Sequence, residues 1–220
     1  ESVADVARVF SRYCDFIIIR TYAQKEVEDL ARYASVPVIN ALTDLLHPCQ
    51  VLSDAFTIME IKGRLEGISI AYVGDGNNIA HSLLNLACRI PLDLRIATPP
   101  MYQPVEGIVE NARKHGISRI SLTSDPVEAV RGADVVYTDV WASMGQKHLA
   151  TEKEKALSPY QVNAELVKHA KPDFIFMHCL PAERGKEVTD EVIDGPNSVV
   201  FEQAENRLHM QKALLAYIFR

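Results

Sequence analysis

Short apolar runs alternate with amphipathic stretches through most of the 220 residues, and this alternation restricts the fold more than any other feature. The runs have the length of strands, and the stretches between them show the spacing of helices with one buried face. Strands and helices that alternate over short connections predict parallel βαβ units, and therefore a doubly wound α/β sheet. The predicted strands are residues 16–19, 68–73, 93–97, 119–122, 135–138, 174–177 and 198–201.

A candidate domain boundary follows one of the predicted helices. The helix of residues 48–62 precedes Gly63 and Gly67, which loosen the chain, so we expect a boundary near residues 60–66. Residues 147–159 lack a clean period and are expected to form a loop or a short mobile helix. The predicted helices are residues 3–13, 23–33, 48–62, 79–89, 104–115, 126–131, 164–170 and 203–219.

Composition excludes several classes of protein. The 23 Lys and Arg residues against 29 Asp and Glu give a net charge of −6, which argues against nucleic-acid binding. No apolar run approaches the length of a membrane-spanning helix. The four cysteines form no CxxC motif, and no His/Cys pair has zinc-site spacing, so we expect buried thiols, no metal and a cytoplasmic protein. The chain opens Glu1-Ser2-Val3 without Met and reads as part of a longer protein, which leaves an organelle matrix open.

Polar clusters follow several predicted strands, where parallel sheets bind their ligands. The first cluster is Gly74-Asp75-Gly76-Asn77-Asn78. Its glycines permit a tight turn that presents helix N–H groups to an anion. The structural alternative is that an asparagine of this cluster caps the next helix. Ile79 breaks the GxGxxG spacing, and this weakens a nicotinamide-dependent oxidoreductase, the generic expectation for such a fold.

A second cluster, Asp139 to Gln146, holds the single Trp of the chain and a Ser-Met-Gly turn. Asp139 can pair with a substrate ammonium, and the Ser143 hydroxyl with nearby turn N–H groups can receive a carboxylate. The cluster therefore suits an α-amino acid. A capping Asp followed by an ordinary loop is the alternative.

The third cluster is Met177-His178-Cys179-Leu180-Pro181. Cys179 is a candidate nucleophile, metal ligand or polar contact to substrate. Adjacent strand residues point to opposite faces, so His178 is poorly placed to activate Cys179.

Two further segments carry groups suited to an anion. His47 and Gln50 flank the start of a helix and, with Arg20 at a strand end, could converge on one anionic group; the alternative is that His47 is a helix cap. Arg207 begins the last helix in Glu205-Asn206-Arg207 and would hold a phosphate or form a surface salt bridge of little energy.

In this order, the segments resemble the signature segments of the aspartate/ornithine carbamoyltransferase family. The Ser-Met-Gly turn and the His-Cys-Leu-Pro segment resemble its ornithine-specific members. The resemblance implies two doubly wound parallel-sheet domains, the first incomplete in this chain. It divides the chain into residues 1–62, the rest of a carbamoyl-phosphate domain, residues 63–201, an ornithine domain, and residues 202–220, a helix that returns to the first domain. The segments are His47–Gln50, Asp139–Gly145, His178–Pro181 and Glu205–Arg207.

The resemblance also implies the reaction, transfer of a carbamoyl group from carbamoyl phosphate to the δ-amine of L-ornithine, giving L-citrulline and phosphate in arginine biosynthesis. It implies a homotrimer and no cofactor. Arg20, His47 and Cys179 would be catalytic, with Arg20 and His47 polarising the carbamoyl oxygen and Cys179 near the δ-amine. The carbamoyl-phosphate group would be Arg20, His47, Gln50, Cys179, Leu180 and Arg207, and the ornithine group Asn78, Asp139, Ser143 and Met144.

One departure from the family keeps alternatives open. The Ser-x-Arg-Thr-Arg phosphate loop of the family does not occur in these 220 residues, so we expect little or no carbamoyl transfer from this chain by itself and an unstable first domain. A truncated amino-acid-binding paralogue without catalysis is one alternative. Another is a carbamoyltransferase for putrescine or acetylornithine, although Asp139 and the Ser-Met-Gly turn argue against putrescine, which has no α-amino or α-carboxylate group.

Overall fold

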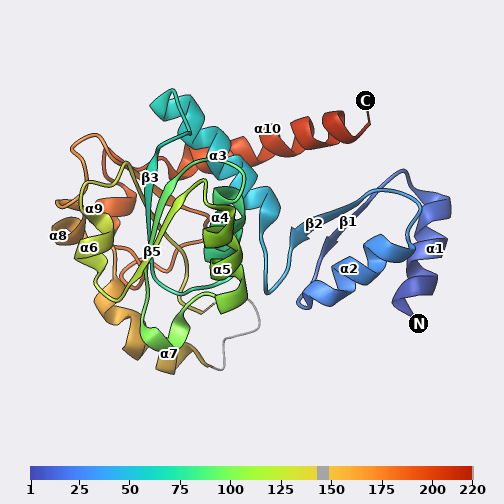
Figure 1. Cartoon of the computed structure of the whole chain (residues 1–220), viewed down its shortest axis with the longest axis horizontal. Helices are drawn as coiled ribbons and strands as arrows, with labels where there is room; N and C mark the ends of the chain where they lie inside the picture. The colour runs from blue at the N-terminus through green and yellow to red at the C-terminus, as the bar shows by residue number, and fades with distance from the viewer. Residues whose placement is uncertain (143–148, 220) are drawn as a thin grey trace.

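The computed structural model describes residues 1–142 and 149–219, which form two parallel sheets of unequal size (Figure 1). The smaller unit comprises α1 (Val3–Tyr13), β1 (Ile17–Arg20), α2 (Gln24–Tyr33), β2 (Val38–Leu42) and α3 (Pro48–Lys62). The larger unit follows with β3 (Ser69–Val73), α4 (Asn78–Ala87), β4 (Asp93–Ala97), η1 (Pro100–Tyr102), α5 (Glu106–His115), β5 (Arg119–Thr123), α6 (Pro126–Val130), β6 (Val135–Thr138), α7 (Ala150–Leu157), η3 (Ser158–Tyr160), α8 (Ala164–Val167), β7 (Ile175–His178), α9 (Asp190–Ile193) and α10 (Val200–Ile218).

The larger sheet has the order β5-β4-β3-β6-β7, and every strand pair in it is parallel. All residues of β3 are buried, because helices cover both faces of the sheet. Ile70 and Tyr72 pack with α3, α4 and α5, whereas Ala71 and Val73 pack with α6, α8 and α9. This two-sided burial explains why the strands are apolar runs rather than alternating sequences. The predicted α/β class with parallel sheets is confirmed.

The order of this sheet also locates a place for ligands. The chain moves outward from β3 to β4 and β5, and then returns to the other side of β3 for β6 and β7. The reversal lies between β3 and β6, so the loops after these two strands diverge and leave a crevice at the carboxyl edge.

The smaller unit has only β1 and β2, which pair in parallel beside α1 and α2 (Figure 1). Ala7, Ile17 and Leu30 form its small core. The prediction of a buried strand at residues 16–19 is wrong for Ile18, which is 55% exposed. The described helices cover one face of this sheet, and Ile18 points to the opposite face from its neighbours.

The last helix joins the two units. α10 packs along α3, and the ring of Phe219, the residue that follows it, lies 5.5 Å from the ring of Phe16 (Figure 1). The strand predicted at residues 198–201 is wrong. Only Ser198 makes a bridge, to Phe176, and α10 begins at Val200, because a short apolar run does not by itself distinguish a strand from a buried helix start. From residue 149 on, the segment predicted as a loop or short helix is helical.

None of the described helices is long and apolar enough to cross a membrane.

Candidate functional site

A pocket of about 550 Å³ lies between the smaller unit and the carboxyl edge of the larger sheet. Gln50 is buried behind the pocket wall, and Ser143 and Met144 lie outside the described residues. The other predicted site residues all line the pocket, although they come from six elements or loops and from both units. They are Arg20, His47, Asn78, Asp139, Cys179, Leu180 and Arg207.

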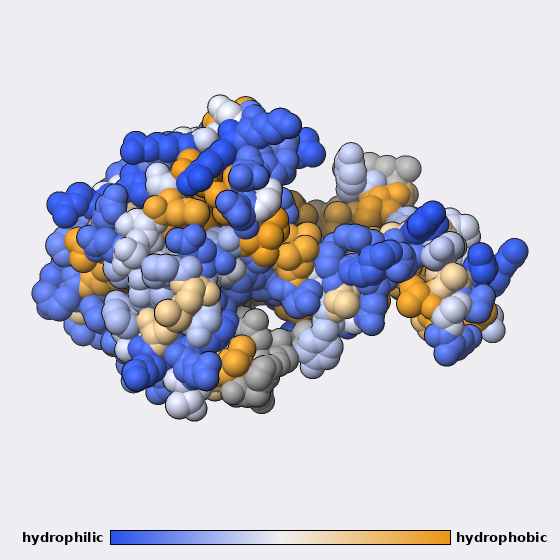
Figure 2. Space-filling view, turned by 60° about the horizontal axis from the view of Figure 1, so that its bottom comes forward, coloured by the Kyte–Doolittle hydropathy of each residue, from blue (hydrophilic) through white to orange (hydrophobic). Residues whose placement is uncertain are grey.

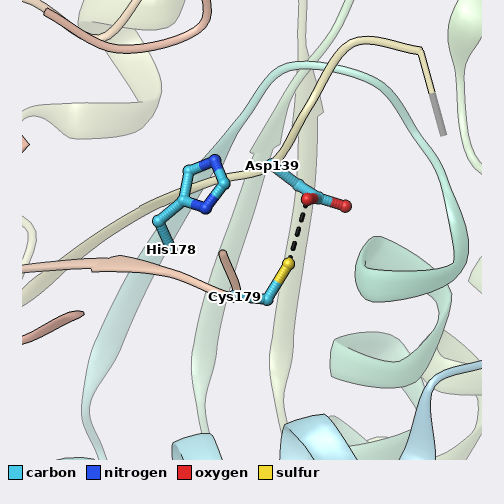
Figure 3. A group of neighbouring side chains, drawn as sticks. All are labelled: Asp139, His178 and Cys179. Carbon is cyan, nitrogen blue, oxygen red and sulfur yellow. Dashed lines mark hydrogen bonds between the residues drawn. The ribbon is translucent and has the colours of Figure 1, made fainter. Parts of the chain in front are cut away.

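Asp139, directly after β6, is the most tightly held of these groups. Its Oδ1 accepts from the Cys179 thiol at 3.0 Å and from the Val140 N–H at 2.8 Å. Its Oδ2 accepts from the Asn77 side-chain amide at 2.7 Å. Figure 3 shows the Asp139 carboxylate directed toward Cys179. Donors from three separate segments therefore fix a buried anionic group at the wall of the pocket.

The same contact decides how Cys179 behaves. Burial raises the pKa of the Cys179 thiol well above its ordinary value, and the negative charge of Asp139 raises it further. The sulfur therefore carries its proton near neutral pH and donates it to the carboxylate. Of the three roles left open by the sequence, this geometry favours a polar contact to substrate over a thiolate nucleophile.

His178 serves a different neighbour. Its Nδ1 accepts from the Leu180 N–H at 2.9 Å, and its Nε2 lies 3.3 Å from a carboxylate oxygen of Glu187, with both side chains fully buried. Leu180 has φ = 54°, a left-handed conformation that is costly for a residue with a side chain, and this hydrogen bond helps to hold it. His178 thus supports the backbone of the pocket wall and does not activate Cys179.

Donor atoms of Asp139, His178 and Cys179 lie within 4.8 Å of one another (Figure 3). Zinc binding would require a Cys179 thiolate, and the raised pKa of the thiol opposes it. The imidazole Nδ1 already accepts from a backbone amide. The trio therefore fits a hydrogen-bonded cluster better than a metal centre.

Three basic residues that line the pocket form what we call the basic wall. Arg20 ends β1, His47 precedes α3, and Arg207 lies on α10. Burial and the charge of Arg207 lower the pKa of His47 to about 4, so its imidazole is neutral near pH 7. His47 Nδ1 is buried and has no hydrogen-bond partner among the described residues, and the side chain does not cap α3. The helix-cap alternative for His47 is therefore not supported, and its ring nitrogen is suited to a ligand.

The two asparagines after β3 make different contacts. Asn77 caps α4, accepting from the Ile79 N–H at 3.0 Å, and also donates to Asp139. The Asn78 amide donates to the Thr43 carbonyl at 2.8 Å, which ties the two units together at the pocket. The sequence left either asparagine as a possible cap, and the family resemblance put only Asn78 in the site. Two adjacent Asn residues at a strand end are the signal that would have included both.

Close packing explains the glycines of this loop. A Cβ atom at Gly76 would lie 2.4 Å from the backbone nitrogen of Pro104, and the Gly76 N–H donates to the Tyr102 carbonyl at 2.8 Å. The loop therefore needs glycine to approach another chain segment. This packing leaves the nicotinamide alternative without support from the glycines.

Sequence reasoning missed a buried ion pair at the pocket. Lys153 of α7 donates to the Asp75 carboxylate at 2.5 Å, and its Nζ lies 5.1 Å from the centre of the Tyr102 ring. Burial raises the pKa of Asp75, and the charge of Lys153 opposes that rise. No sequence pattern joins residues this far apart in the chain.

Comparison with known proteins agrees with this geometry. The family model of the aspartate/ornithine carbamoyltransferase carbamoyl-P binding domain matches residues 1–60, and that of the Asp/Orn binding domain matches residues 66–218. The chain is similar to the ornithine carbamoyltransferase of Thermococcus kodakarensis, with 59% identity over 99% of this chain and 70% of that protein. It is 55% identical to the Bacillus subtilis ornithine carbamoyltransferase over 99% of this chain and 69% of that protein.

Solved structures give the same result. The ornithine carbamoyltransferase from Pyrococcus furiosus matches with a TM-score of 0.92 at 58% identity, over 98% of this chain and 70% of that one. The anabolic enzyme from Campylobacter jejuni matches with a TM-score of 0.94 at 39% identity, over 99% of this chain and 73% of that one.

Proposed function

The chain belongs to the aspartate/ornithine carbamoyltransferase family, and we propose that its site serves the transfer of the carbamoyl group of carbamoyl phosphate to the δ-amine of L-ornithine. One observation carries the proposal. The same pocket is lined by the basic wall of Arg20, His47 and Arg207 and by the firmly held Asp139 with Cys179. The doubly charged acyl phosphate suits the basic wall, and the ammonium group of a diamino acid suits the Asp139 carboxylate.

The basic wall is assigned to carbamoyl phosphate. Arg20 and Arg207 supply positive charge for the phosphate, and Gln50 holds Arg207 through a hydrogen bond of 2.7 Å. His47 is assigned with Arg20 to the carbamoyl oxygen, as the family resemblance implies. Hydrogen-bond donors at that oxygen stabilise the negative charge that develops there during attack.

The wall around Asp139 is assigned to L-ornithine. The Asp139 carboxylate pairs with the α-ammonium, and Asn78, Ser143 and Met144 complete this subsite as the family resemblance implies. The protonated Cys179 lies near the δ-amine as a polar contact. It does not act as the base, because its pKa is raised rather than lowered.

The reaction needs no covalent intermediate on these residues. The δ-ammonium first loses a proton to solvent, and the amine nitrogen then donates its electron pair to the carbamoyl carbon. The carbon–oxygen bond to phosphate breaks, the bonding pair leaves with the phosphate, and the phosphate takes the second proton from the attacking nitrogen. Holding both substrates in one pocket supplies much of the rate enhancement, since it converts a bimolecular encounter into a unimolecular step.

The proposal extends to the assembly and setting expected from the family. It includes the division into residues 1–62, 63–201 and 202–220, a homotrimer, a cytoplasmic location and a biosynthetic direction leading to arginine. The word anabolic in the names of the Pyrococcus furiosus and Campylobacter jejuni relatives supports that direction.

Calorimetry and a citrulline assay test the proposal together. L-ornithine should bind in the presence of carbamoyl phosphate, whereas putrescine and acetylornithine should bind far more weakly. Asp139→Asn should weaken L-ornithine binding about 10- to 100-fold, the loss expected for one charge-assisted contact. Asp173→Asn, at an exposed carboxylate, is the matched control and should leave the affinity for L-ornithine unchanged.

The outcomes separate the alternatives. Ornithine binding without binding of carbamoyl phosphate would favour the non-catalytic amino-acid-binding paralogue. Equal binding of putrescine, or equal ornithine affinity in the Asp139→Asn variant, would contradict the assignment of the Asp139 wall.

A further inference from the structure

A fully buried carboxylate lies behind the pocket and is linked by hydrogen bonds to two parts of its lining. Asp54, near the middle of α3, has no exposed surface and lines no part of the pocket. Its Oδ1 accepts from the Gln50 amide at 2.8 Å and from the Gln203 amide at 2.7 Å. Its Oδ2 accepts from the Tyr137 hydroxyl at 3.0 Å.

We propose that Asp54 is a positioning residue that sets the amide orientation of Gln50 and Gln203, and through them one group on each wall of the site. The inference rests on the proposed function for the meaning of the two walls. The orientation itself is a property of this chain that can be measured without any substrate.

The shape of an amide explains how one acceptor can set both orientations. A glutamine amide has its NH₂ group and its carbonyl oxygen on opposite sides, so an acceptor that binds the NH₂ group fixes where the oxygen points. With its NH₂ on Asp54, Gln50 directs its oxygen to the Arg207 guanidinium at 2.7 Å. Gln203 in the same way directs its oxygen to the His178 backbone N–H at 2.9 Å.

These two endpoints belong to different parts of the pocket. Arg207 contributes to the basic wall, while the His178 backbone leads directly into Cys179 and Leu180. Asp54 thereby couples α3, α10 and β7, which are distant in the sequence. Without an acceptor at Asp54, the Gln50 NH₂ group would be buried and unsatisfied, and the Gln203 NH₂ group would keep its longer contact to the Tyr137 hydroxyl at 3.1 Å. Both amides would lose the acceptor that sets their orientation.

Charge at Asp54 matches this role. Burial raises the pKa of Asp54 to about 6, and hydrogen bonds from Gln50, Gln203 and Tyr137, followed by the charge of Arg207, oppose that rise. Near pH 7.5 the group is therefore a carboxylate with acceptors only, and it cannot donate to either glutamine oxygen and reverse their orientation.

Three variants separate positioning from simple packing. Asp54→Leu removes both acceptors at similar volume, whereas Asp54→Asn keeps an oxygen for the two glutamine amides. Tyr137→Phe is the control for the bond to Oδ2. It also removes the hydroxyl that accepts from Gln203 Nε2 at 3.1 Å, but it leaves both glutamine bonds to Oδ1 in place. Two readouts are used at pH 7.5: hydrogen exchange of the His178 backbone amide, and calorimetric binding of carbamoyl phosphate.

Asp54→Leu should accelerate His178 amide exchange at least 10-fold relative to neighbouring β7 amides and weaken carbamoyl-phosphate binding at least 10-fold. In Asp54→Asn and in Tyr137→Phe, the His178 exchange rate and the carbamoyl-phosphate affinity should both stay within about 3-fold of the parent values. Where Asp54→Leu does not fold, Gln203→Leu replaces it for the exchange readout and Gln50→Leu for the binding readout, each expected to change only its own readout.

The proposal is overturned when a folded Asp54→Leu chain exchanges the His178 amide as slowly as the parent chain. It is also overturned when Tyr137→Phe changes the exchange rate and the carbamoyl-phosphate affinity as much as Asp54→Leu does. Unchanged His178 exchange in Gln203→Leu overturns it equally. Should the chain bind no carbamoyl phosphate at all, the proposed function fails, while the exchange readout still decides the role of Asp54.

Discussion

The two units use similar local sequence but bury it to different depths. In the larger unit every residue of β3 is buried, whereas in the smaller unit Ile18 in β1 is more than half exposed. Figure 2 shows hydrophobic surface on the smaller unit and at its junction with the larger one. An apolar run therefore predicts a strand in both places, but the number of covered faces decides how much that strand stabilises the fold.

One charged pair from each unit shows a similar difference in burial. Lys153 and Asp75 pair with side chains that are only 4% and 6% exposed. Lys25 and Asp29, one helical turn apart in α2, pair with side chains that are 70% and 29% exposed. The first pair depends on its mutual contact, because neither charge has much water around it.

The largest predicted difference comes from these two lysines. Lys153→Met leaves the Asp75 carboxylate buried without its cation, and we expect a loss of about 3–5 kcal/mol in the free energy of unfolding. Lys25→Met in the smaller unit should cost less than about 0.5 kcal/mol. Urea denaturation measures both, and equal costs would show that the depth of burial does not distinguish the pairs.

A smaller but still clear difference is expected from two isoleucines. Ile70→Ala removes a fully buried side chain from the core of the larger sheet and should cost about 3 kcal/mol. Ile18→Ala removes one that already faces solvent over more than half its surface and should cost less than about 1 kcal/mol. Should Ile18→Ala prove as costly as Ile70→Ala in denaturation experiments, the open face of the smaller sheet would be covered in solution.

The smallest predicted effect is a pH dependence at the junction of the units. The pKa of His47 is about 4 in the folded chain and near 6.5 when unfolded, so the unfolded state binds more protons between these values. The contribution of His47 to stability is therefore present above pH 6.5 and is lost as the pH falls toward 4, by about 2 kcal/mol.

Denaturation curves between pH 4 and 7 test this sign. The stability difference between the parent chain and His47→Asn should shrink as the pH falls through this window. His115→Gln, at an exposed histidine of α5, is the control and should leave the shape of the pH curve unchanged. A difference that stays constant, or grows toward acid, would contradict a neutral buried His47.

Several site residues were predictable because they follow strands. Asp139 and Cys179 come at the ends of β6 and β7, which are neighbours, and parallel strands bring their carboxyl ends to one edge. His47 and Arg207 were found through motifs rather than position. The periodicity could also assign nearly all helices, failing mainly where the apolar run at residues 198–201 begins α10.

Asp54 and Lys153 show what could not be predicted in this way. A polar residue within a predicted helix is ordinarily solvent-exposed, and Asp54 is buried only because both α4 and α10 pack on α3. Lys153 is one of several charged residues in the sequence of α7, and nothing in that sequence predicts its burial. It is buried because it contacts Asp75 and Tyr102 from other loops.

The amino-acid sequence alone determined the alternation of strands and helices, the parallel class of the sheet and the polar groups at the strand ends, because these depend on neighbours within a few residues. Tertiary structure alone decided that Cys179 keeps its proton, that His47 is neutral and that Asp54 faces two glutamines. Those properties depend on desolvation and on charges or donors contributed by distant segments, which only packing brings within a few ångströms.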